Sequence, residues 1–140
     1  MIQIAYWSGT GNTENMATYI AEGIVAGGSE VHTSHVSNIG VEEMLEANLI
    51  VLGCPAMGAE ELEEDEMLPF VEALLPHMQG KRVALFGSYG WGSGEWMENW
   101  SEQMRAAGAT IVCEPLIINE FTKGQDEEIC TVYGKNLVSL

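Results

Sequence analysis

A loop of small and hydroxyl residues near the N-terminus has the composition of an anion-binding site. It reads Ser8-Gly9-Thr10-Gly11-Asn12-Thr13, and a helical pattern follows at once. The unpaired N–H groups and the positive dipole end of that helix would face the loop, and a phosphate fits there. A glycine turn in which Thr or Asn merely caps the helix is the structural alternative, and this loop alone leaves both open.

Two common nucleotide-binding motifs are excluded by the spelling of this loop. A P-loop requires G-x-x-x-x-G-K-[ST], and the first lysine of the chain is Lys81. A dinucleotide fingerprint requires G-x-G-x-x-G, and Glu14 stands where the third glycine would be. That side chain would crowd a pyrophosphate. The loop therefore predicts a site for one terminal phosphate, held by neutral donors.

Two later loops each carry one large flat or polarizable side chain among small residues. The second loop reads Pro55-Ala56-Met57-Gly58-Ala59-Glu60, and the third begins Ser88-Tyr89-Gly90-Trp91-Gly92. Met57 and Trp91 could each be ordinary packing residues, but together they could sandwich a planar ring. A phosphate at the first loop and an aromatic ring between the other two describe flavin mononucleotide (FMN).

The elements that must position these loops are short apolar runs that alternate with helical patterns. Strands are predicted at 2–7, 31–36, 49–54, 82–87 and 110–118, and helices at 12–26, 41–46, 63–78, 94–107 and 126–138. Continuous apolar strands alternating with helices indicate a parallel sheet covered on both faces, here in one domain over residues 1–140. Ligands of such doubly wound folds bind beyond the carboxyl ends of the strands, where all three loops would lie.

Charge is the strongest global feature of the sequence. Twenty-one acids oppose five bases, for a net charge of −16. Nucleic acid is excluded as a partner, because its binders present a basic surface. Two interpretations remain open: the acids keep the protein soluble, or they steer it toward a basic partner.

The remaining composition predicts a cytoplasmic protein with free thiols. No apolar stretch is long enough to span a bilayer, and the first residues lack the features of a signal peptide. Cys54, Cys113 and Cys130 have no spacing typical of a disulfide framework or a zinc site, so buried free thiols are expected. A monomer without membrane insertion is expected.

Three stretches, in order and spacing, resemble the short-chain flavodoxins, especially those of clostridia and related anaerobes. They are SGTGNT, PAMGAEELE and FGSYGWGSGEWM, and the similarity is weakest from Asn119 onward. The last strand lacks the insertion that marks the long-chain branch. The resemblance implies a flavodoxin-like doubly wound α/β fold, a three-layer α/β/α sandwich with five parallel strands in the order 2-1-3-4-5.

The resemblance also implies how FMN is bound. Trp7 would lie over the phosphate site, Met57 would cover the inner ring face and Trp91 the outer one. The phosphate ligands would be Ser8, Gly9, Thr10, Gly11, Asn12 and Thr13. The ribityl chain and the pyrimidine side of the flavin would contact Ser88, Tyr89, Gly90, Trp91 and Gly92. Pro55 and Ala56 belong to the loop that carries Met57.

One peptide would respond to the redox state of the flavin. The bond joining Gly58 to Ala59 would flip, turning the Gly58 carbonyl toward flavin N5–H, while the Glu60 carboxylate would meet N3–H. Close relatives often have Asp where this chain has Ala59. Because a β-carbon opposes φ > 0 and Asp tolerates it better than Ala, we expect the flip to cost more here.

The function expected is low-potential one-electron transfer, cycling semiquinone and hydroquinone between basic-faced, ferredoxin-type redox partners, with no catalytic residue and no metal. The carboxylates, six of them within residues 60–66, would oppose added negative charge on the ring and lower its potential. The same run could simply be a solvated helix start.

Two other functions are weighed against this one. An FMN-dependent NAD(P)H or quinone reductase on the same fold would need positive charge near the loops, and the five bases are scattered away from them. A phospho-receiver domain would need clustered aspartates after the first strand, where this chain has Tyr6-Trp7-Ser8.

Overall fold

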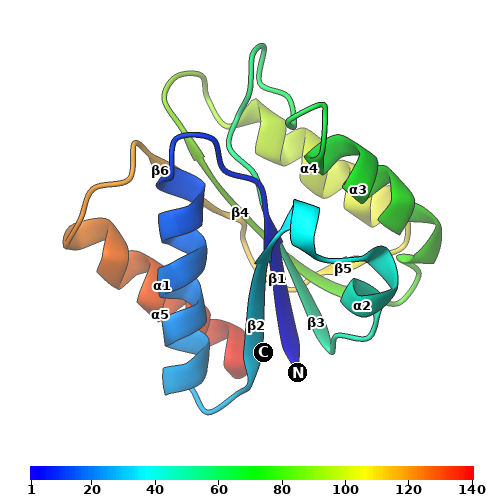
Figure 1. The fold of residues 1–140 in the computed structure, drawn as a ribbon, viewed down its shortest axis with the longest axis horizontal. Helices are drawn as coiled ribbons and strands as arrows, with labels where there is room; N and C mark the ends of the chain where they lie inside the picture. Colours follow the sequence, from blue (N-terminus) through cyan, green and yellow to red (C-terminus); the bar gives the residue numbers. More distant parts are fainter.

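A parallel β-sheet with helices on both faces forms the framework of the protein (Figure 1). The computed structural model describes the whole chain, residues 1–140. The strands are β1 (Ile2–Tyr6), β2 (Val31–His35), β3 (Leu49–Gly53), β4 (Arg82–Tyr89), β5 (Thr110–Ile111) and β6 (Leu116–Asn119). Their order is β2-β1-β3-β4-β5, which confirms the predicted doubly wound topology.

The fifth predicted strand, 110–118, is wrong as a single element. β5 pairs with β4 at Arg82 and Val83, and β6 resumes the pairing at Phe86, so the sheet has an extra short strand. The chain leaves the sheet between them, just before Pro115, which has no N–H to donate. Within this interval the Tyr133 hydroxyl donates to the Leu85 carbonyl at 3.3 Å, so a side chain satisfies an acceptor that strand pairing leaves free.

The helices divide between the two faces of the sheet. On one face lie α1 (Asn12–Ala26) and α5 (Gln125–Val138); on the other lie α2 (Val41–Leu45), α3 (Met67–Leu74) and α4 (Glu95–Ala106). Short 3₁₀ turns, η1 (Val36–Asn38) and η2 (Leu75–His77), follow β2 and α3. No helix is both long and apolar enough to cross a membrane.

The predicted helix 63–78 is shorter than expected at both ends. Its α-helical part begins at Met67 and ends at Leu74. Glu63 does not enter the helix, because its carboxylate accepts hydrogen bonds from the N–H groups at the helix start. The η2 turn, with Pro76 near its start, replaces the last predicted turn.

Alternation along the strands divides the apolar side chains between two cores. On β3, Ile50 and Leu52 face the helices α2, α3 and α4, whereas Leu49 and Val51 face α1 and α5. All four side chains are buried, which is the pattern of a parallel sheet covered on both faces.

A close contact between α1 and α5 depends on two glycines. A β-carbon at Gly23 would lie 2.0 Å from the Thr131 carbonyl oxygen, and one at Gly134 would lie 2.1 Å from that of Ile20. Only glycine lets the two backbones approach so closely. This contact fixes the position of α1. The loop that follows β1 leads directly into the first turn of this helix.

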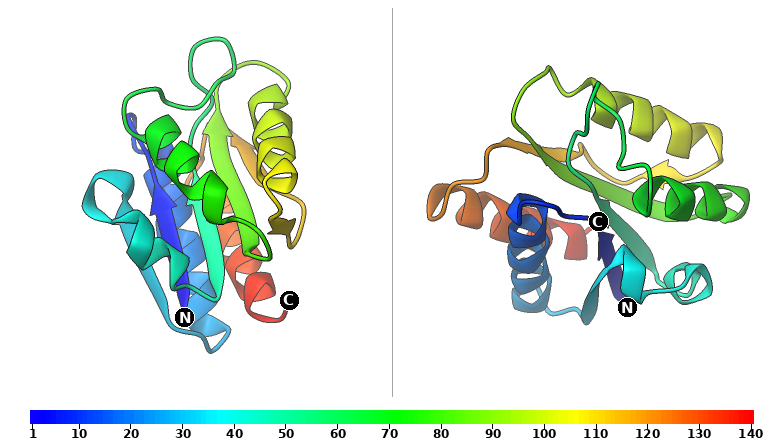
Figure 2. Two further views of the ribbon diagram at one scale, coloured as in Figure 1. Left: turned by 90° about the vertical axis from the view of Figure 1, so that its right-hand side faces the viewer. Right: turned by 45° about the horizontal axis from the view of Figure 1, so that its top comes forward.

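The loops after β1, β3 and β4 gather at one end of the sheet, opposite both termini (Figure 2). Parallel strands bring their carboxyl ends to the same edge, so loops far apart in the sequence become neighbours.

Candidate functional site

A cleft of about 330 Å³ lies where the three loops meet. Its volume falls in the range of small-molecule sites. Most of its lining was predicted from the sequence: Trp7, Gly9, Thr10, Asn12, Pro55, Ala56, Met57, Ser88, Tyr89 and Gly90. The structure therefore brings parts of all three loops to one cavity, while their individual roles toward a cofactor stay predictions.

The loop after β1 leaves three of its backbone N–H groups without an acceptor in the chain. Gly11 has φ 99° and forms the N-cap of α1, a conformation that favours glycine. The Ser8 hydroxyl oxygen accepts from the N–H groups of Gly11 and Glu14, at 3.1 and 3.3 Å. The N–H groups of Thr10, Asn12 and Thr13 donate to no acceptor in the chain. A phosphate would satisfy these donors at a helix start.

Thr13 joins this loop to the end of β4. Its Oγ1 lies 2.8 Å from Ser88 Oγ, and both side chains are buried. Ser88 also binds the second loop, because its carbonyl accepts from the Ala56 N–H at 3.0 Å. One residue at the end of β4 thus connects all three loops.

The second loop closes into a tight turn between Met57 and Glu61. Their backbone groups exchange two hydrogen bonds of 2.8 Å. Within the turn, Gly58 and Glu60 have positive φ, 47° and 59°, whereas Ala59 does not. In this conformation the non-glycine residue with left-handed strain is therefore Glu60, while the expected cost at Ala59 concerns the flipped peptide and stays a prediction.

Glu60 ties this turn to the third loop. Its Oε1 accepts from the N–H groups of Ser93 and Gly94, each at 3.0 Å. Gly92 leaves room for this contact, because a β-carbon there would lie 2.3 Å from the same oxygen. The predicted contact of Glu60 with flavin N3–H would have to use the other carboxylate oxygen.

The third loop offers backbone donors but keeps its tryptophan outside the cleft. The N–H groups of Gly90, Trp91 and Gly92 donate to no group of the chain. Trp91 is 66% exposed and does not line the cleft. Met57, the other predicted ring-flanking residue, does line it.

Trp7 connects the first loop to the acidic segment, which we define as residues 60–66. Its indole Nε1 donates to Glu66 Oε1 at 3.2 Å, and its ring packs against Gly9, where a β-carbon would lie 2.9 Å from the ring. His35 lies beside it, with ring centroids 6.5 Å apart. The indole is thereby fixed at the edge of the cleft.

Glu63 holds the acidic segment in place from within. It is 6% exposed, and its carboxylate accepts from the N–H groups of Asp65, Glu66 and Met67 at 2.7 to 3.0 Å. Burial alone would raise the pKa of Glu63, but these donors lower it below its ordinary value. Glu63 is therefore a charged, structural carboxylate.

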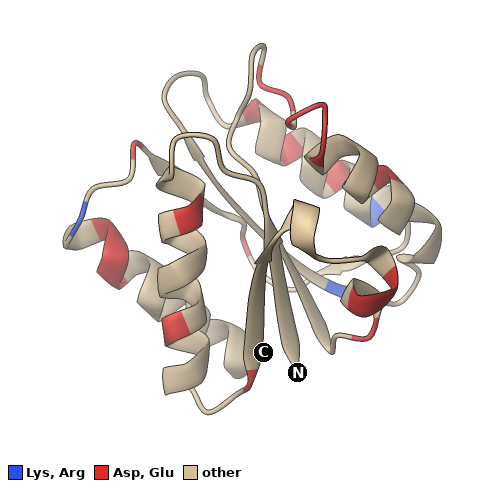
Figure 3. Ribbon diagram, viewed as in Figure 1, with Lys and Arg blue, Asp and Glu red and all other residues tan.

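No base lines the cleft, whereas Glu120 lines it and the neighbouring segment 60–66 carries six acids (Figure 3). Lys81 donates to the Leu45 carbonyl and Arg82 to that of Leu140, both at the opposite end of the sheet. Arg105 pairs with Glu102 in the last turns of α4. These three bases therefore do not offset the negative charge at the cleft.

Sequence reasoning missed one lining residue, Glu120. It follows β6, has φ 47°, and its N–H donates to the Tyr89 carbonyl at 2.9 Å. We searched the loops after the first, third and fourth strands only. Applying the same rule to the last strand would have found it.

The other predicted residues lie around the cleft instead of in its wall. The first loop is held in shape by the hydrogen bonds of Ser8 and Thr13 and by the left-handed conformation of Gly11. The outer turns hold Gly58, Ala59, Glu60, Trp91 and Gly92. Chemically, the arrangement offers free N–H donors from the first loop for an anion and from the third loop for ring acceptors, and Met57 lines the same cleft.

Comparison with known proteins gives consistent matches. The family model described as Flavodoxin matches residues 4–131. The flavodoxin of Clostridium beijerinckii is 45% identical over 99% of this chain and 100% of its own length. The flavodoxin of Megasphaera elsdenii is 46% identical, covering 91% of this chain and 92% of its own. The solution structure of the two-electron reduced M. elsdenii protein superposes with a TM-score of 0.90 at 43% identity, covering both chains completely.

Proposed function

The chain belongs to the flavodoxin family, and from that premise we propose that it transfers single electrons at low potential between redox enzymes. The cofactor of this family is FMN, and its members are electron carriers and not enzymes. When bound, the flavin supplies the redox chemistry. The protein contributes binding, orientation and the electrostatic field.

The observation that carries the proposal is the set of free backbone donors in two loops that meet at the cleft, where Thr10, Asn12 and Gly90 line its wall. The N–H groups of Thr10, Asn12 and Thr13 are suited to the phosphate, and those of Gly90, Trp91 and Gly92 to the ring carbonyl and nitrogen acceptors. Met57 would lie against one ring face. These residues fit FMN and require no charged ligand.

The field of the protein supports the low potential. Its net charge is −16, and no base lines the cleft. Adding an electron to a buried ring becomes less favourable as negative charge accumulates around it, so the potential of that step falls. We propose that the working cycle uses the semiquinone and hydroquinone forms.

The reductase alternative has no structural support of its own. Binding a nicotinamide nucleotide would require cations at the cleft, and none of the five bases lines it. We also propose that the protein acts as a monomer in the cytoplasm, with partners that present basic faces.

A stepwise anaerobic reduction of the FMN-loaded protein tests this function. We expect a blue neutral semiquinone to accumulate after the first electron, and a second step at a potential below that of free FMN. Direct two-electron reduction without that absorption would contradict the proposal. Oxidation of NADPH by the isolated protein would favour the reductase instead.

A further inference from the structure

The acidic segment has two sides with different roles. Three carboxylates, Glu60, Glu63 and Glu66, recur every third residue, and each accepts a hydrogen bond from the chain. The other three, Glu61, Glu64 and Asp65, are exposed and accept none. The segment is therefore not a uniformly solvated run: its three outer carboxylates, Glu61, Glu64 and Asp65, are the ones without a hydrogen-bond partner in the chain.

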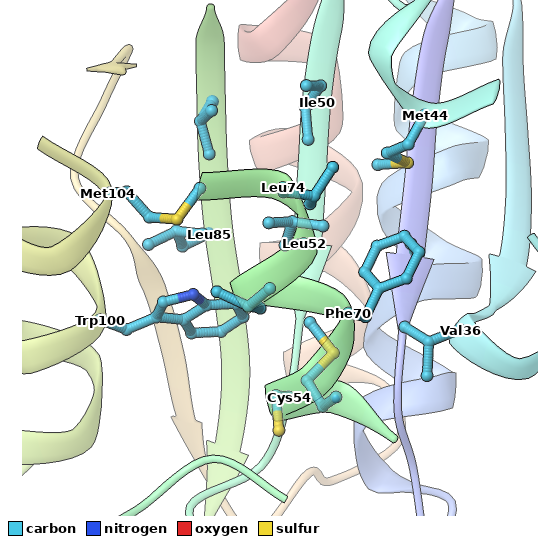
Figure 4. Close-up of a cluster of buried hydrophobic side chains, with 14 of the residues drawn as sticks. Val36, Met44, Ile50, Leu52, Cys54, Phe70, Leu74, Leu85, Trp100 and Met104 are labelled. Atoms are coloured by element: carbon cyan, nitrogen blue, oxygen red, sulfur yellow. The ribbon is translucent and has the colours of Figure 1, made fainter. Parts of the chain in front are cut away.

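Beside these outer carboxylates runs a groove of about 660 Å³ between the acidic segment and α4. Its apolar lining is formed by Leu62, Leu68, Trp96 and Trp100, and its polar rim by Glu60, Glu61, Glu64, Asn99 and Gln103. Figure 4 shows Trp100 reaching from α4 toward β4 and the side chains of α3. Trp96 and Trp100 are each 2% exposed, so the floor belongs to the rigid core.

We propose that this groove docks an arginine or lysine side chain from a basic surface of the redox partner. The aliphatic stem would lie on Leu62 and Leu68, and the cationic head would meet Glu61 and Glu64. Long basic side chains bury their stems on apolar surface while keeping the charge among polar groups, which is the combination this groove presents. The inference rests on the proposed function, because it names the partner surface of the same carrier.

Charge complementarity selects this occupant over an apolar segment or a second copy of the chain. No base lines the groove, and three carboxylates stand on its rim. A second copy would bring its own net charge of −16 to the same place. Isolated surface ion pairs contribute little, so the apolar floor is needed to hold the stem.

The position of the groove fits electron transfer. The turn from Met57 to Glu61 separates it from the cofactor cleft, since Met57 lines the cleft and Glu61 lines the groove. A side chain anchored there would hold the partner next to the turn that covers the flavin. The docking site and the cofactor site would thus share one loop.

A titration of the ¹⁵N-labelled, FMN-loaded protein with hexa-arginine amide tests the groove. We expect saturable shifts at Glu61, Glu64, Asn99 and Gln103 and at the indole N–H of Trp96. Shifts spread equally over the distant exposed acids, such as Glu42 and Glu43 of α2, would overturn the proposal. No saturable shift at any groove residue would overturn it as well.

Two matched pairs of variants separate the groove from net charge. Gln103→Arg places a basic side chain in the groove, whereas Gln125→Arg places one on exposed α5. We expect the first variant to bind the peptide at least about fivefold more weakly than the parent, and the second less than about twofold more weakly. Equal effects would overturn the proposal.

The second pair removes carboxylates. The double variant Glu61→Gln, Glu64→Gln should bind the peptide at least about fivefold more weakly than the parent. The control double variant Glu42→Gln, Glu43→Gln has the same net charge and should bind it less than about twofold more weakly. Equal weakening would contradict docking in the groove. These outcomes are independent of the reductive titration. If the protein forms its semiquinone but the peptide binds elsewhere, the docking proposal is wrong while the proposed electron-transfer function stands.

Discussion

Thr13 Oγ1 and Ser88 Oγ lie 2.8 Å apart inside the protein, and they join the start of α1 to the end of β4. Seventy-five residues separate them in the sequence. Because the Ser88 carbonyl also accepts from the Ala56 N–H, this pair holds the loop after β1 in register with the loops after β3 and β4.

Thr13→Val should weaken FMN binding about tenfold and lower the free energy of unfolding by about 1–3 kcal/mol, because it leaves a buried hydroxyl without its partner. Flavin fluorescence gives the dissociation constant and urea unfolding the stability. Thr18→Val is the control, since Thr18 is exposed and its hydroxyl donates only to the Glu14 carbonyl. Binding of FMN by Thr13→Val as tight as in the parent would refute the role of this pair.

Glu63→Gln should destabilise the protein by about 1 kcal/mol at pH 7, because it removes a charged cap of three N–H groups. The pKa of Glu63 is lowered by folding from the ordinary 4.5, so its contribution is complete above that pH and is lost as the pH falls below it. Urea unfolding should therefore show a difference in the free energy of unfolding between parent and variant that is smaller below pH 4.5 than at pH 7. A difference in unfolding free energy that does not depend on pH would contradict the assignment of Glu63 as a charged cap.

Gly134→Ala should cost about 2–4 kcal/mol, despite the better helix propensity of alanine, because its methyl group would overlap the Ile20 carbonyl. Gly40→Ala is a suitable control, since a β-carbon there meets nothing within 4 Å and φ is −89°. Thermal unfolding of both variants checks the difference. If Gly134→Ala were as stable as Gly40→Ala, the close approach of α1 and α5 would be wrong.

One thiol should react with a disulfide reagent in the native protein at pH 8. Burial raises the pKa of Cys54 and of Cys130 to about 12, which leaves almost no thiolate. Cys113 is only half-buried, contrary to our expectation of three buried thiols. Labelling followed by mass spectrometry should find Cys113 first. Rapid labelling of Cys54 would indicate that the second loop opens.

Ala59→Gly tests the cost of the proposed peptide flip. Ala59 has no positive φ in the present turn, so glycine relieves nothing here and should lower stability by up to about 1 kcal/mol through the unfolded state. If the flipped turn requires φ > 0 at this residue, the variant should stabilise the semiquinone relative to the parent. Equal potentials in the two titrations would remove the strain argument.

The sequence by itself determined the architecture and the location of the site. Continuous apolar strands alternating with helices specify a parallel sheet, and the carboxyl ends of such strands converge, so the three loops had to meet. Local patterns also placed α1 at Asn12–Ala26, because glycines stand at both of its ends.

Only the tertiary structure decided which side chains act on which neighbours. The acids of residues 60–66 are alike in sequence, yet Glu60 binds Ser93 and Gly94 while Glu63 caps α3. The partners of Glu60 lie 33 and 34 residues away, so they are set by loop packing and have no local signal, whereas Glu63 binds N–H groups within four residues. The break between β5 and β6 and the groove beside α4 likewise depend on how separate elements meet, which periodicity along the chain does not encode.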